Sequence, residues 1–111
     1  MLVELTILPI GHSPHTAVEL AGVLQLIEAS GLPFQLTPSA TCLEGPWPKV
    51  MAVVEQCHAY ARQRSSHVVT LVKIEDEAGV DNILTSNVAS IERKVGHCLS
   101  RPTPAVTELP L

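Results

Sequence analysis

Histidine and cysteine are the residue types in this chain best suited to catalysis or metal binding, and they occur in two adjacent pairs. Cys57 precedes His58, and His97 precedes Cys98. Neighbouring residues on a helix point about 100° apart, so neither pair can hold one zinc ion. The third cysteine, Cys42, is far from both pairs, and the chain has no CxxC spacing. We therefore expect three reduced thiols, no metal site and a cytoplasmic location.

A nucleophile lies near possible bases where Ser13 stands between His12 and His15. A triad also needs a third group that orients the base, and no motif places an acidic residue for that role. The sequence has no GxSxG, P-loop or GxGxxG motif. We read these histidines as loop residues and expect no enzyme activity and no cofactor. An enzyme that uses one of the histidines is the least favoured alternative.

Glu44 stands at the end of a predicted strand, directly before the segment Gly45–Pro46 that opens a predicted helix. The positive end of that helix would keep the carboxylate ionised, and it could accept a hydrogen bond from a ligand amine. A helix-capping or salt-bridging glutamate is the alternative, which spacing alone slightly favours. Both interpretations remain open at this stage.

Composition limits the class of protein. The 111 residues are 46% hydrophobic and 16% charged, with a formal net charge of −4 and only three aromatic residues. This length suits one domain, and the charge and scarcity of aromatics argue against nucleic-acid binding. Apolar stretches are too short to span a membrane. A small domain with this high a hydrophobic content is expected to bury apolar surface between the subunits of a homo-dimer or homo-tetramer.

The elements that must position any site follow from periodicity. Four segments have the composition and alternation of strands: residues 2–10, 33–37, 39–44 and 67–75. Three have helical spacing of apolar residues: 15–30, 49–64 and 84–96. The order predicts an α+β, ferredoxin-like β-α-β-β-α-β domain over residues 1–99, with an antiparallel four-stranded sheet and an additional C-terminal helix. Residues 100–111 form a proline-rich tail, expected to be extended or disordered.

Two further expectations concern surfaces. Thr16 and Glu19 could form a capping box at the start of the first helix, which is apolar around most of its circumference and so predicts packing on two sides. The helices should cover one face of the sheet and leave the other open. On one reading of the alternation, the polar strand residues share a side: Glu4, Thr6, Thr37, Ser39, Thr41 and Thr70.

Four segments, in order and at matching spacing, resemble the small thiamine-binding proteins of the YkoF-like family: Leu8–Gly11, Ala29–Pro38, Thr41–Gly45 and Val68–Asp76. The resemblance spans residues 2–97. It implies a ferredoxin-like fold, dimers and tetramers assembled through the sheets, and binding of thiamine or its hydroxymethylpyrimidine moiety without established catalysis. The chain departs from the family at Glu77–Gly79, where an arginine is usual, and in the loop His12–His15.

A flat aminopyrimidine joined to a cationic thiazolium suits an apolar slot with a few fixed polar groups. The residues expected to supply that slot, from the resemblance and the strand ends, are Pro9, Gly11, Ser39, Thr41 and Glu44. The expected function is therefore thiamine binding by a homo-oligomer, with no nucleic-acid or membrane partner. The alternative is a structural or small-molecule-sensing oligomeric module that does not bind thiamine.

Overall fold

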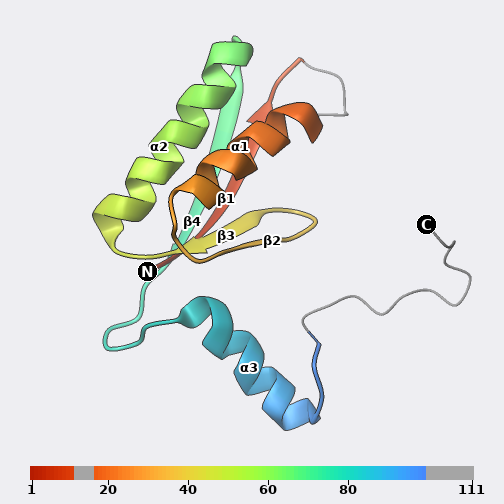
Figure 1. Ribbon diagram of the computed structural model, residues 1–111, viewed down its shortest axis with the longest axis vertical. Helices are drawn as coiled ribbons and strands as arrows, with labels where there is room; N and C mark the ends of the chain where they lie inside the picture. Colours follow the sequence, from red (N-terminus) through yellow and green to blue (C-terminus); the bar gives the residue numbers. More distant parts are fainter. Residues whose placement is uncertain (12–16, 100–111) are drawn as a thin grey trace, which may run out of the picture.

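The computed structural model describes residues 1–11 and 17–99 (Figure 1). The elements it forms are β1 (Leu2–Pro9), α1 (Ala17–Ala29), β2 (Phe34–Leu36), β3 (Thr41–Glu44), α2 (Trp47–Arg64), β4 (Val68–Glu75) and α3 (Ile83–Val95). Every predicted element is present, and its bounds differ from the prediction by at most two residues. The predictions for the His12–His15 loop, for Thr16 as a cap and for the tail from Ser100 concern positions outside the described residues.

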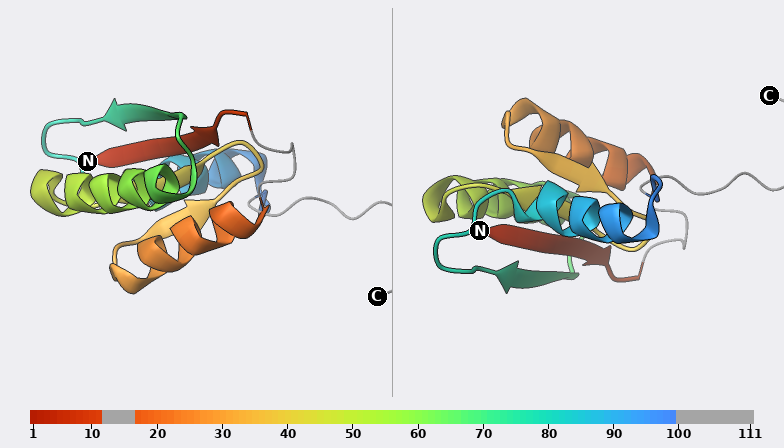
Figure 2. Two further views of the ribbon diagram at one scale, coloured as in Figure 1. Left: turned by 90° about the horizontal axis from the view of Figure 1, so that it is seen from above. Right: turned by 90° about the horizontal axis from the view of Figure 1, so that it is seen from below.

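The four strands form one antiparallel sheet in the order β2-β3-β1-β4. Strand β3 lies between β1 and β2, which therefore run parallel to each other. This is the split β-α-β arrangement of the ferredoxin-like fold, so that prediction is confirmed. In the views of Figure 2, α1 and α2 lie on one side of the sheet, and α3 lies at its end.

The core lies between this covered face and the two helices. Val3 and Leu5 of β1 and Leu43 of β3 contribute the sheet side, as the alternation of β1 predicts. The helices contribute a regular stripe of small and branched residues: Val23, Ile27, Val50, Val53, Val54 and Cys57. Helix α1 comes close to α2 because Gly22 has no side chain; a Cβ there would meet the Tyr60 hydroxyl at 1.9 Å.

The register corrects one expectation. Thr41 is paired with Leu5, and Thr70 with Ile7, so both threonines lie on the covered face. Glu4 and Thr6 alternate with these β1 residues and lie on the open face. The expected hydroxyl-rich side therefore does not exist as one surface. The single-sequence alternation fails here because it cannot show which residues of two strands stand opposite each other.

The open face and α3 leave apolar side chains uncovered. Leu8 and Leu71 on the open face are 42% and 54% exposed, and Ile91 of α3 is 57% exposed. On α1, Val18 is 81% exposed, which agrees with a helix that is apolar on more than one side. None of the helices in the described part of the chain is long and apolar enough to cross a membrane.

Candidate functional site

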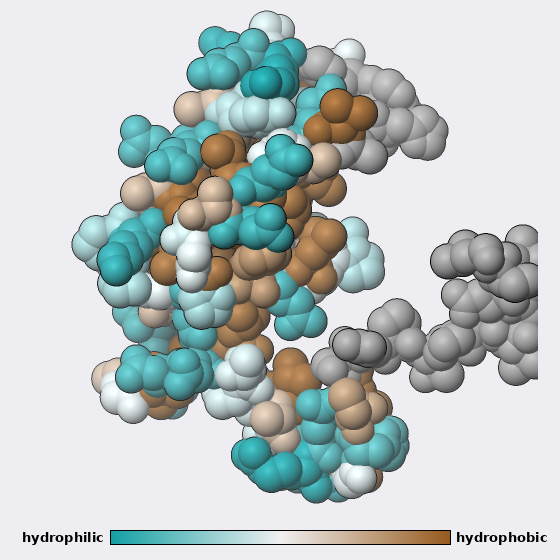
Figure 3. All heavy atoms as spheres, viewed as in Figure 1, coloured by the Kyte–Doolittle hydropathy of each residue, from teal (hydrophilic) through white to brown (hydrophobic). Residues whose placement is uncertain are grey.

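A cavity of about 190 Å³ opens where three elements meet at one end of the sheet. The N-terminal half of α1, the C-terminal half of β1 and the connection between β2 and β3 form its walls. Its apolar lining includes Leu5, Ile7, Leu20, Val23, Leu36 and Ala61. Figure 3 shows hydrophobic residues (brown) gathered in the middle of the molecule, over α1 and the strands beside it.

Thr41 is the most buried polar residue of the cavity lining. It is only 4% exposed, and its hydroxyl makes no hydrogen bond to another described residue. No buried side-chain oxygen or nitrogen of the described residues lacks a hydrogen-bond partner, so the unbonded Thr41 hydroxyl is open to the cavity, where a ligand or water can bond to it. Thr41 stands on the covered face because it is paired with Leu5.

The connection between β2 and β3 supplies the second polar group. Thr37 stabilises this turn twice: its hydroxyl donates to the carbonyl of Ala40 at 2.7 Å and accepts from the Ala40 amide at 3.1 Å. Ser39, at the tip of the turn, is exposed and also lines the cavity. The Thr6 hydroxyl donates to the Ser39 carbonyl at 3.4 Å, which ties the tip to β1.

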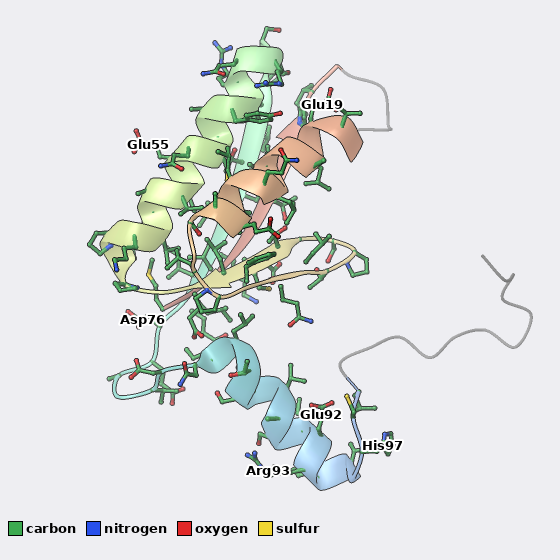
Figure 4. The ribbon with its side chains drawn as sticks, in the orientation of Figure 1. Glu19, Glu55, Asp76, Glu92, Arg93 and His97 are labelled. Carbon is green, nitrogen blue, oxygen red and sulfur yellow. The ribbon has the colours of Figure 1, made fainter. Side chains whose placement is uncertain are left out.

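Glu19 is a cavity residue that the sequence analysis did not select. It lies in the first turn of α1, lines the cavity and is partly buried. Figure 4 shows it at the end of α1 next to the end of β1, whereas Glu55 projects from the outer side of α2. The expectation of a capping box with Thr16 obscured this role. Its position in the chain could have identified Glu19, because the first turn of α1 follows the end of β1, where Pro9 was predicted to be a site residue.

The five predicted ligand-binding residues fall into two groups. Pro9, Ser39 and Thr41 line the cavity together. Gly11 does not line it; it lies two residues beyond Pro9 with φ +82°, a backbone conformation that favours glycine. Glu44 is at the opposite end of β3, on the other face of the sheet.

Glu44 binds the start of α3. Its Oε2 accepts hydrogen bonds from the amides of Ile83 at 2.6 Å and Leu84 at 3.4 Å. Asn82, the residue before the helix, gives no side-chain cap, so the carboxylate takes that place. The capping alternative of the sequence analysis therefore agrees with the structure, but for α3 rather than α2. A ligand contact by Glu44 stays a prediction.

The cysteines and histidines are dispersed. Among the described residues, no three histidine, cysteine, aspartate or glutamate side chains cluster as a metal site would require. His58 contacts the Thr70 hydroxyl through Nδ1 at 2.6 Å, which links α2 to β4.

Burial raises the pKa of the Cys57 thiol to about 11. Burial, and then the nearby Glu4 carboxylate, also raise the pKa of Cys42. Raised pKa values make both thiols poor nucleophiles.

Solved structures resemble this fold closely. The Methanocaldococcus jannascii protein MJ1052 superimposes with a TM-score of 0.76 at 18% identity, covering 81% of this chain and 93% of its own. The Thermotoga maritima protein TM0486, provisionally described as a thiamine biosynthesis/salvage protein, gives a TM-score of 0.67 at 22% identity, covering 86% of this chain and 94% of its own. At these identities the likeness concerns the fold.

Sequence relatives are closer. The UPF0045 protein Mb1933 of Mycobacterium bovis is 30% identical over 94 residues, which is 84% of this chain and 92% of that protein. The UPF0045 protein YqgV of Bacillus subtilis is 31% identical over 98 residues, 83% of this chain and 94% of that protein. The profile of the family described as "Thiamine-binding protein" matches residues 3–92. This chain therefore belongs to the thiamine-binding protein family.

Proposed function

We propose that this protein binds thiamine, or its hydroxymethylpyrimidine moiety, in the cavity between α1, β1 and the β2–β3 turn, as a cytoplasmic homo-oligomer that catalyses no reaction. The observation that carries the proposal is Thr41. The residue is buried beside an apolar cavity, and its hydroxyl, open to that cavity, makes no hydrogen bond to any described residue. Family membership supplies the identity of the ligand.

The size and lining of the cavity favour one ring of the ligand. Pockets that bind drug-sized ligands measure roughly 300–1,000 Å³, whereas this cavity measures about 190 Å³. The pyrimidine ring would fit between the apolar walls, with the rest of thiamine extending toward the opening. Thr41 and Ser39 offer hydroxyls to the donors and acceptors on the edge of the ring, and Pro9 adds an apolar wall.

Isothermal titration calorimetry with thiamine and with hydroxymethylpyrimidine tests this function. If the pyrimidine ring occupies the cavity, both compounds bind with similar affinities. The affinity of a free thiazole, which lacks the pyrimidine, should differ from both by more than they differ from each other. Absence of heat and of a melting-temperature shift with both compounds would contradict the proposal and favour the alternative, an oligomeric module that does not bind thiamine.

Exposed apolar residues support the homo-oligomer. Leu8, Val69 and Leu71 lie together on the open face of adjacent strands β1 and β4, and each is at least 37% exposed. Such a patch on a small domain usually marks a contact with another protein. Light scattering should give a dimer or tetramer, and Leu71→Asp should shift the mass toward the monomer. A monomeric parent protein at micromolar concentration would contradict this part.

A further inference from the structure

Among the described residues that line the cavity, Glu19 is the only charged one. The remaining lining is apolar or carries hydroxyl groups. Glu19 is partly buried and accepts no hydrogen bond from another described residue, so nothing in the described structure neutralises its carboxylate. The field of a partly buried charge is less screened by water than that of an exposed one.

No arginine or lysine of the described chain lines the cavity, and the two arginines that follow the lining residue Ala61 at the end of α2 are already engaged. Arg62 follows the lining residue Ala61, but its guanidinium donates to the Ser65 carbonyl at 3.1 Å. Arg64 donates to the Tyr60 carbonyl and stacks over the Tyr60 ring, 3.6 Å from its centroid. Neither is among the residues that line the cavity.

A phosphate group needs arginine or lysine side chains, or the free amides of a helix N-terminus. The one helix N-terminus at this cavity is that of α1, and Glu19 stands in its first turn. A carboxylate there already complements the helix dipole and would repel a phosphate. The lining therefore favours a cationic ligand and disfavours an anionic one.

Resting on the proposed function, we propose that Glu19 selects the cationic, unphosphorylated form of the ligand, so that the cavity takes thiamine and rejects its phosphate esters. Thiamine carries a permanent positive charge on its thiazolium ring, which would lie near the cavity opening when the pyrimidine is inside. Its monophosphate adds negative charge at that same end. Hydroxymethylpyrimidine lacks the thiazolium and serves as the uncharged reference.

The test compares Glu19→Gln with Glu28→Gln by calorimetry against thiamine, thiamine monophosphate and hydroxymethylpyrimidine. Both variants remove one negative charge from α1, but Glu28 is exposed and does not line the cavity. The parent should bind thiamine at least about tenfold more tightly than the monophosphate, because the added phosphate is repelled by the Glu19 carboxylate. Glu19→Gln should narrow that ratio to about threefold or less and leave hydroxymethylpyrimidine binding nearly unchanged, while Glu28→Gln should behave like the parent.

The outcomes separate the two proposals. Suppose that the parent binds thiamine and hydroxymethylpyrimidine. If Glu19→Gln then keeps the parental ratio of thiamine to monophosphate affinity, or if the parent binds the monophosphate as tightly as thiamine, selection by Glu19 is wrong and the binding function stands. If the parent binds none of the three compounds, both proposals are wrong. Equal melting temperatures of the two variants would exclude unfolding as a cause of altered affinity.

Discussion

Thr41 and Glu44 stand at the two ends of the same short strand, and both are polar residues in buried surroundings, 4% and 9% exposed. Their hydrogen-bonding groups are used in opposite ways. The Glu44 carboxylate is occupied by two amides of α3, whereas the Thr41 hydroxyl has no partner among the described residues. The three-residue separation also puts them on opposite faces of the sheet.

This difference shows how to separate a structural polar residue from a binding one. Burial is similar at the two ends and both residues are polar, so neither property distinguishes them. What distinguishes them is whether the fold itself satisfies the polar group, because a group that the fold satisfies contributes to stability and one that it leaves unsatisfied is available to a ligand. Substitutions at the two ends should therefore affect different measurements.

Glu44→Ala should have the largest effect, and on stability. It leaves the buried amide of Ile83 without an acceptor and removes the charge at the start of α3, at a cost of about 3 kcal/mol. The melting temperature should fall by roughly 10–20 °C, measured by differential scanning calorimetry, with thiamine affinity unchanged at a temperature where the variant is folded. Glu75→Ala is the matched control. Glu75 is exposed and pairs with Leu2 from β4, just as Glu44 pairs with Leu2 from β3. A tenfold loss of affinity without a stability change would instead make Glu44 a ligand residue.

Cys57 is a third case, because its thiol is buried and makes only one long hydrogen bond. Its thiol lies 3.9 Å from the Val23 carbonyl, and its pKa is raised from 9.0 to about 11 by burial. Only the thiolate reacts with iodoacetamide, so at pH 8 the raised pKa alone should slow alkylation by about a hundredfold relative to the unfolded chain. Peptide mass spectrometry at increasing pH measures this.

The raised pKa of Cys57 also makes the stability of the folded protein depend on pH. Because the pKa is higher in the folded state, the neutral thiol contributes stability that is fully present below pH 9 and is lost as the pH rises through about 11. Rapid alkylation of Cys57 in the native protein at pH 8 would mean that the α1–α2 packing opens readily.

Thr41→Val should act on binding rather than on stability. Valine has the shape of threonine without the hydroxyl, and no hydrogen bond to a described residue is lost. Thiamine affinity should fall about fivefold, corresponding to one neutral hydrogen bond of roughly 1 kcal/mol, and the melting temperature should stay equal or rise. Thr85→Val on α3, outside the cavity, should leave affinity unchanged. A drop in melting temperature with unaltered affinity would place Thr41 with Glu44 as a structural residue.

Ser39→Ala should have the smallest effect. The side chain lines the cavity but is exposed, so water competes with any hydrogen bond that it makes to a ligand. Affinity should fall about twofold by calorimetry, with no change in stability. A loss larger than that of Thr41→Val would mean that the turn tip, and not the buried strand end, dominates recognition.

Much of this molecule could be predicted from the sequence because local periodicity controls it. Alternation in residues 2–10 identified the buried side chains Val3 and Leu5, and the apolar spacing of residues 49–64 identified the core stripe of α2. The order of elements then left few possible topologies. Pro9, Ser39 and Thr41 were predicted to share a site from the family resemblance and from their places at strand ends, but Gly11 and Glu44, predicted with them, do not line the cavity.

Only the tertiary structure shows what Glu44 contacts, where Glu19 lies and which face of the sheet carries the strand threonines. Glu44 contacts a helix whose first residue is 39 positions away in the chain, and Glu19 lines the same cavity as the β2–β3 turn. The side of the sheet on which Thr41 and Thr70 lie depends on register between strands. By itself the sequence determined which residues are apolar, the type and order of the elements, and hence the fold. Which polar groups the fold satisfies depends on contacts between distant segments, and no local pattern encodes those.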